Sequence, residues 1–178
     1  ASVDVVTYEF ENVPAAALDL IESLVPIRPN RRALSAAARV YAVQALFQME
    51  AADQSADRVV REFANWRIGV DYDEGTSPEA DEDLFERIVD GAVNWQARID
   101  QMTDRALVAK WPIDRIDPVL RAVFRAAGSE LVGADTPPRV VISEYVAVAD
   151  AFFPEGKEAR FVNAVLDHMA RAARPEAF

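Results

Sequence analysis

The chain contains no cysteine among its 178 residues. Disulfide bonds, cysteine-ligated zinc and thiol catalysis are therefore excluded, and we expect a protein of the reducing cytoplasm. Glycine is scarce as well, with 6 residues in the whole chain. So few glycines argue against an all-β fold with many tight turns and favour a helical protein.

The chain also has a single histidine, His168. A protein with no cysteine and one histidine lacks the usual ligands of a transition metal, so we expect no metal site. The 6 glycines lie too far apart to form a phosphate-binding loop. Because no catalytic group, metal or cofactor is indicated, we do not expect the chain to be an enzyme.

No apolar run approaches the ~20 residues that a membrane-spanning helix needs. The first residues lack the basic and apolar segments of a secretory signal. Hydrophobic residues nevertheless make up 51% of the chain, which is enough to form a core. We therefore expect a folded protein that has no membrane partner.

Acidic residues are absent between Glu22 and Glu50, although the chain as a whole carries a net charge of −11. The basic residues in this window are Arg28, Arg31, Arg32 and Arg39. The window therefore carries +4 and leaves −15 for the rest of the chain. Such asymmetry is typical of a local polyanion site on an acidic body. Arginines that only solvate the start of a helix would give the same pattern.

Alternating β-branched and aromatic residues from Val3 to Phe10 predict a strand, and we expect it to have no partner within the chain. After residue 34, apolar residues recur every three or four positions, which predicts helices. The first two are expected to be capped by Ser35 and Ser55, and the third to run unbroken from Ser77 to Met102.

Further helices are expected from Pro118 to Gly133, from Pro138 to Phe152, and over about 158–172. Six or seven helices joined by short loops make an all-α bundle. The predicted fold is therefore all-α, with a short strand-helix extension at the N-terminus.

Four ordered segments carry a more specific pattern: ARVYAVQALFQME, WPIDRIDPVLRAVFRAAGSEL, PPRVVISEYVAVADAFF and RFVNAVLDHMA. Together they resemble the NusB family of transcription antitermination factors over about residues 36–173. The resemblance implies an all-α fold with two small helical bundles set across each other. It also implies binding of a single-stranded RNA element, boxA, together with NusE, a basic ribosomal protein. In that family the complex helps RNA polymerase to read through terminators.

The resemblance further implies which side chains contact RNA. These candidates are Arg31, Arg32, Arg39, Arg125, Lys157 and Arg160. Arg125 and Glu130 could instead pair within or between helices. We expect Tyr41 and Phe47 in the core rather than as platforms for base stacking. Ser129 stands where the family tends to have tyrosine.

The opening segments VDVVTYEFENVPAAALDLIES and VPIRPNRRAL resemble an internal piece of PurK, the ATP-dependent carboxylase of aminoimidazole ribonucleotide. The resemblance covers about residues 3–34 and implies a strand, a helix and a second strand of a parallel α/β subdomain. The ATP-grasp body and its metal-binding carboxylates are not in this chain, so Glu9 and Glu11 cannot perform that chemistry. We therefore expect a non-catalytic segment over 1–34 and a helical RNA-binding domain over 35–178.

Two functions of different classes fit these observations. The first is an antitermination factor that binds boxA-like RNA and a NusE-like protein within an RNA polymerase complex. The second is an acidic protein-binding module, such as an antitoxin-like inhibitor of a basic protein, with no RNA role. The net charge favours the second function, whereas the four ordered segments favour the first. A vestigial purine enzyme is a weaker third alternative, since it rests on the opening segment alone.

Overall fold

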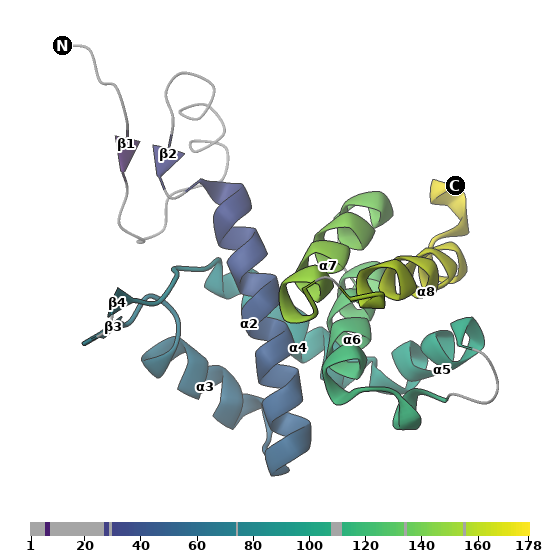
Figure 1. The fold of residues 1–178 in the computed structure, drawn as a ribbon, viewed down its shortest axis with the longest axis horizontal. Coiled ribbons are helices and arrows are strands. Elements are labelled where there is room, and N and C mark those ends of the chain that lie inside the picture. The colour runs from purple at the N-terminus through teal and green to yellow at the C-terminus, as the bar shows by residue number, and fades with distance from the viewer. Residues whose placement is uncertain are drawn as a thin grey trace.

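The protein is built from α-helices, as expected (Figure 1). The computed structural model describes residues 30–73, 75–107, 112–133, 135–154 and 156–178, together with the backbone of 6–7 and 27–28. The helices in this part are α2 (Arg31–Ala52), α3 (Ala56–Trp66), α4 (Glu82–Asn94), α5 (Gln96–Ala106), α6 (Pro118–Gly133), α7 (Pro138–Phe152) and α8 (Glu158–Ala173), with short 3-10 turns η1 (Ile113–Arg115) and η2 (Pro175–Ala177). The all-α prediction is confirmed.

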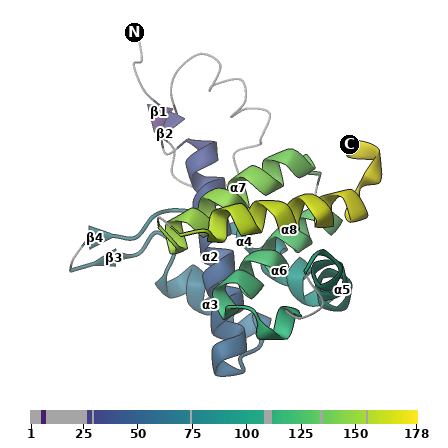
Figure 2. The ribbon, with the colours of Figure 1, turned by 45° about the vertical axis from the view of Figure 1, so that its right-hand side comes forward.

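Helix α6 lies at the centre of the bundle and contacts α2, α4, α5, α7 and α8. Small residues let its neighbours approach closely. At Gly128 an added Cβ would stand 2.4 Å from a methyl group of Ile99 in α5, so a larger side chain would push the two helices apart. Helices α7 and α8 pack against each other, and both contact α6, as Figure 2 shows from a second direction.

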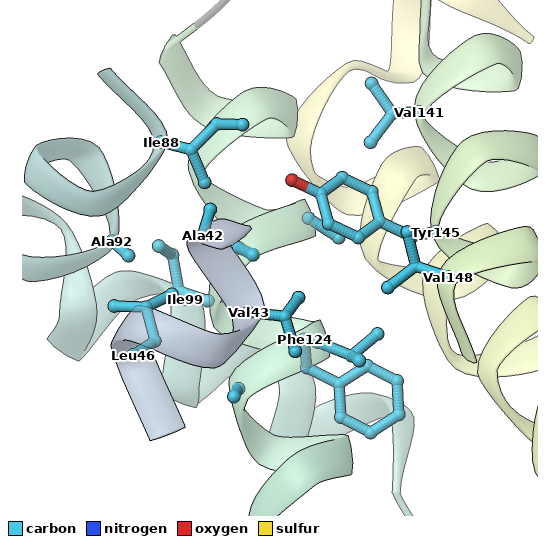
Figure 3. Close-up of a cluster of buried hydrophobic side chains, with 14 of the residues drawn as sticks. Ala42, Val43, Leu46, Ile88, Ala92, Ile99, Phe124, Val141, Tyr145 and Val148 are labelled. Carbon is cyan, nitrogen blue, oxygen red and sulfur yellow. The ribbon is translucent and has the colours of Figure 1, made fainter. Parts of the chain in front are cut away.

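One hydrophobic core joins the helices (Figure 3). The buried side chains labelled there come from α2, α4, α5, α6 and α7, and include Val43, Leu46, Ile88, Ala92, Ile99, Phe124 and Val148. Burial of each large apolar side chain contributes roughly 1.5–3 kcal/mol, so the core dominates the stability of the fold. No helix in the described ranges is long and apolar enough to cross a membrane.

The first helix begins five residues earlier than expected. Asn30, not Ser35, is its N-cap, because the Asn30 side-chain oxygen accepts a hydrogen bond of 2.8 Å from the backbone N–H of Ala33. The additional turn is part of the packed domain. Leu34 is buried, and its carbonyl accepts a bond of 3.2 Å from the N–H of Asp81.

The prediction of one long third helix is wrong in two places. Ser77 does not cap this helix, because the Ser77 side chain forms hydrogen bonds with the backbone of Val70 in the preceding loop. The N-cap is Asp81, whose side chain accepts a hydrogen bond of 2.9 Å from the backbone N–H of Leu84. The helix then breaks at Trp95, which separates α4 from α5. The Trp95 ring packs directly on Gly133 of α6, where an added Cβ would be 2.0 Å away. Apolar spacing continues across the break, so the pattern alone did not reveal it.

A small hairpin occupies the loop between α3 and α4. Strand β3 (Asp71–Tyr72) pairs antiparallel with β4 (Gly75–Thr76), with Asp71 opposite Thr76. Figure 2 shows that this hairpin projects away from the bundle. Two-residue strands leave no period-2 pattern, so the sequence does not predict this hairpin.

The expectation that the opening strand has no partner is wrong. Strand β1 (Val6–Thr7) pairs in parallel with β2 (Ile27–Arg28), with Val6 opposite Ile27. Both strands belong to the segment that resembles PurK, so the strand finds its partner inside that segment. The remainder of the predicted strand over 3–10, the helix expected after it, and Glu9 and Glu11 lie outside the described residues.

We expect a chain of residues 30–178 to keep the helical fold, whereas residues 35–178 should be markedly less stable. The longer form retains the Asn30 cap, worth about 1 kcal/mol, and buried Leu34, worth about 2 kcal/mol. For a chain of this size, a loss of about 3 kcal/mol lowers the melting temperature by roughly 6–12 °C. Circular dichroism during thermal unfolding measures both forms beside the full chain. Loss of helix content in the 30–178 form would contradict a domain boundary between residues 29 and 30.

Candidate nucleic-acid interface

One exposed cation, Arg32, stands at the N-terminal end of α2. The side chain of Arg32 is 88% exposed and lies 3.7 Å from Glu144 of α7, whereas Arg31 beside it is half-buried. An ion pair this exposed contributes little to stability, so Arg32 can exchange its partner at low cost. The contact also places the start of α2 alongside the middle of α7.

Two further cations, Lys157 and Arg160, lie where α8 begins, and both are exposed. Neither forms an ion pair with another residue in the described ranges. They follow α7 in the chain, and α7 contacts α2 at two places: Glu144 lies 3.7 Å from Arg32, and Phe152 lines a groove with the second half of α2. Figure 1 and Figure 2 both place the end of α7 beside α2.

Arg39, a predicted RNA contact, is buried instead. Its side chain is 6% exposed, and its guanidinium donates to both carboxylate oxygens of Glu130 in α6, at 2.8 and 2.9 Å. Glu144 approaches it at 3.9 Å from α7. Burial opposes the charge of Arg39, but the hydrogen bond and charge of Glu130 outweigh it and raise the pKa of Arg39. The guanidinium joins helices and does not face solvent.

Arg125 is also held in an ion-pair network. Its guanidinium donates to both oxygens of Asp100 in α5, at 3.0 and 2.9 Å, and to Glu50 at the end of α2, at 2.9 Å. Arg121 bonds the same Glu50, and these two arginines hold the pKa of Glu50 below its usual value. Arg125 therefore forms ion pairs between helices, which was the alternative to an RNA contact. Its partners are Asp100 and Glu50 rather than Glu130.

An apolar groove of about 450 Å³ lies between α2, α3 and the end of α7. Phe47 lines it and is 39% exposed, so the prediction of a core position for Phe47 is wrong. Half-buried Phe152 lines the groove from α7, and Gln44 and Arg67 supply polar groups beside the rings. Tyr41 is buried as expected, and its hydroxyl donates to the carbonyl of Pro78 at 2.9 Å.

The sequence did not single out this groove. Phe47 and Phe152 both fall on apolar stripes, which predict burial, and no residue pattern says that the neighbouring helices leave the two rings partly uncovered. Arg32 stands at the other end of α2 from the groove, and Lys157 and Arg160 stand at the start of α8, which follows Phe152 in the chain. Aromatic faces stack on bases of any sequence, and lysines and arginines bind phosphates. The arrangement is therefore suited to a single-stranded nucleic acid.

Comparisons with known proteins agree with the fold. The profile of the NusB family matches residues 36–171, and that of the ribonucleotide synthetase preATP-grasp domain matches residues 1–38. A transcription antitermination protein NusB from Maricaulis maris is 48% identical over 150 residues, which cover 84% of this chain and 93% of that protein. Both resemblances noted in the sequence are therefore confirmed.

Solved structures give the same result for the fold. NusB from T. maritima superimposes with a TM-score of 0.64 at 28% identity, covering 84% of this chain and 96% of that one. A NusB solved with NusE in complex with double-stranded RNA also has a TM-score of 0.64, at 22% identity, covering 77% and 96%. These relatives are named for transcription antitermination and not for an enzymatic activity.

Replacing Arg39 by Ala should destabilise the fold by about 3–5 kcal/mol, because it leaves the Glu130 carboxylate buried without a partner. Replacing Arg32 by Ala should cost no more than about 1 kcal/mol, since that pair is exposed. The double change Arg39→Met with Glu130→Leu removes both charges and should be less harmful than Arg39→Ala. Urea denaturation measures all three. Equal stability of the Arg39→Ala and Arg32→Ala variants would show that the buried pair carries no special weight.

Proposed function

This chain belongs to the NusB family of transcription antitermination factors, and we propose that it acts by binding boxA-type single-stranded RNA together with a basic ribosomal protein of the NusE type. The observation that carries the proposal is the groove lined by Phe47 and Phe152, together with the exposed cations Arg32 on α2 and Lys157 and Arg160 at the start of α8. Base stacking on the rings and phosphate contacts to the cations are the two sources of affinity in single-strand binding.

We propose that Arg31, Arg32, Lys157 and Arg160 contact the RNA together with the two phenylalanines. Arg39 and Arg125 support this surface from within, because each holds α2 against α6 or its neighbours. In this proposal they shape the RNA site without touching RNA. We also propose that residues 1–29 form a separate, non-catalytic segment that is not needed for RNA binding.

The proposed protein partner follows from charge. Outside the window between Glu22 and Glu50 the chain carries −15, so its surface repels RNA at long range and attracts a basic protein. A basic partner would cancel that repulsion and add its own phosphate contacts. A related NusB was solved in a complex with NusE and RNA, and this supports a NusE-type partner for this chain. We propose that the resulting complex assembles on RNA polymerase in the cytoplasm.

RNA binding should depend on salt, because counterions leave the RNA as its phosphates are neutralised. Four contacting cations predict a slope of log affinity against log salt of about −3. Replacing Arg32, Lys157 and Arg160 by Ala should flatten that slope by about 2 units. The matched control replaces three exposed arginines of α5 and η1, Arg98, Arg105 and Arg115, by Ala. Filter binding of boxA-like RNA at several salt concentrations compares them, and equal slopes for the two triple variants would place the site elsewhere.

Replacing Phe47 by Ala should weaken RNA binding by about 5- to 150-fold, since stacking contributes roughly 1–3 kcal/mol per base. The salt slope should stay the same, because no charge is removed. Phe178 is exposed to nearly the same extent, 40% against 39%, and lies far from the groove in sequence, so Phe178→Ala is the control. Fluorescence anisotropy of labelled RNA measures both. Wild-type affinity in Phe47→Ala would remove the groove from the proposed site.

RNA and the basic partner should strengthen each other's binding. We expect a coupling of about 1–3 kcal/mol, which is roughly 5- to 150-fold, and reciprocity requires the same factor in both directions. Titrating a NusE-type protein at fixed RNA, and RNA at fixed partner, at two salt concentrations measures it. A partner that binds tightly while RNA never joins would instead support the acidic inhibitor function.

A further inference from the structure

Glu144 on α7 lies between two arginines of α2. One of its carboxylate oxygens is 3.7 Å from Arg32, and the other is 3.9 Å from Arg39. The side chain is 15% exposed, so neighbouring residues cover most of it. Among the described residues, no other acidic side chain comes within ion-pair distance of Arg32. The same carboxylate therefore faces one cation of the proposed RNA surface and one cation of the interior.

Arg39 does not depend on Glu144 for its pairing. Its guanidinium already donates to both carboxylate oxygens of Glu130, at 2.8 and 2.9 Å, and to the carbonyl of Ser35 at 3.4 Å. Two carboxylates thus stand beside one buried guanidinium. The charges balance only while Arg32 remains beside Glu144. When an RNA phosphate takes Arg32, the carboxylate of Glu144 becomes an excess negative charge.

The carboxylate of Glu144 also stays in place during such an exchange. Most of the side chain is covered, and Arg39 continues to attract it from the interior. A phosphate bound to the guanidinium of Arg32 would lie within roughly 10 Å of this carboxylate, given ordinary hydrogen-bond lengths. That distance is no longer than the Debye length of about 10 Å at 0.1 M salt, so salt does not screen the repulsion fully.

We propose that Glu144 is a built-in competitor of RNA, which occupies Arg32 in the free protein and repels the phosphate that replaces it. This inference rests on the function proposed above, in which Arg32 contacts RNA. A phosphate gains less from Arg32 than it would from an arginine with no acidic neighbour. Affinity for RNA therefore depends more on stacking at Phe47, and a ligand that offers phosphates alone is disfavoured.

Replacing Glu144 by Gln should tighten the binding of boxA-like RNA by up to about fivefold, which is the range of an exposed ion pair. The matched control is Glu176→Gln, which also removes one negative charge. Glu176 is exposed in η2, beyond the opposite end of α8 from Lys157 and Arg160. Fluorescence anisotropy of labelled RNA measures both variants of the full chain, and the gain in Glu144→Gln should shrink as the salt concentration rises.

A double-mutant cycle shows whether the effect acts through Arg32. In a chain that already carries Arg32→Ala, the added change Glu144→Gln should tighten RNA binding no more than Glu176→Gln does. The same gain with and without Arg32 would show a general effect of net charge and would overturn the proposed competition.

Glu144→Ala is a second variant, because alanine favours helix and removes the same charge. Circular dichroism checks that each variant keeps the fold. If the wild-type chain binds RNA but neither Glu144 variant binds it more tightly than Glu176→Gln, the inference fails and the proposed function stands. If no form of the chain binds boxA-like RNA, with or without the basic partner, both fail.

Discussion

The buried pair between Arg39 and Glu130 fixes how the first long helix sits on the centre of the bundle. Two parallel hydrogen bonds, of 2.8 and 2.9 Å, allow one relative orientation of guanidinium and carboxylate, so α2 cannot rotate about its axis or slide along α6. A shift of one residue would leave both charges buried and unpaired. Tyr145 completes this environment, since burial, and next the charge of Glu130, raises the pKa of its hydroxyl well above the usual value and keeps it neutral.

The orientation of α2 decides which of its side chains reach the surface. Arg32 lies two helical turns before Arg39 on the same side of the helix, and its side chain is 88% exposed whereas that of Arg39 is 6% exposed. Phe47 lies eight residues after Arg39, rotated by about 80° around the axis, and so faces the groove instead of α6. One interior ion pair thus positions Arg32 and Phe47, the parts of the proposed RNA surface that α2 supplies.

Arginine has two roles in this protein, and the sequence does not separate them. Arg39, Arg121 and Arg125 are largely covered and hold helices together through Glu130, Glu50 and Asp100. Arg32 and Arg160 look much the same in the sequence but project into solvent. A window free of acidic residues therefore overstates the positive charge available to RNA, because an arginine inside it can be neutralised by a carboxylate ninety-one residues away.

The sequence by itself determined the fold class, the family and the limits of α6, α7 and α8. Pro118, Gly133 and Pro138 act on their own segment of backbone, so their effect does not depend on the rest of the molecule. Only the tertiary structure decided that α4 and α5 separate at Trp95, that Arg39 is buried and that Phe47 is exposed. Each of these depends on which helix covers a given face, and that choice arises from contacts between residues far apart in the chain. The spacing of apolar residues shows that one face of a helix is apolar. It does not show how completely a neighbouring helix covers that face.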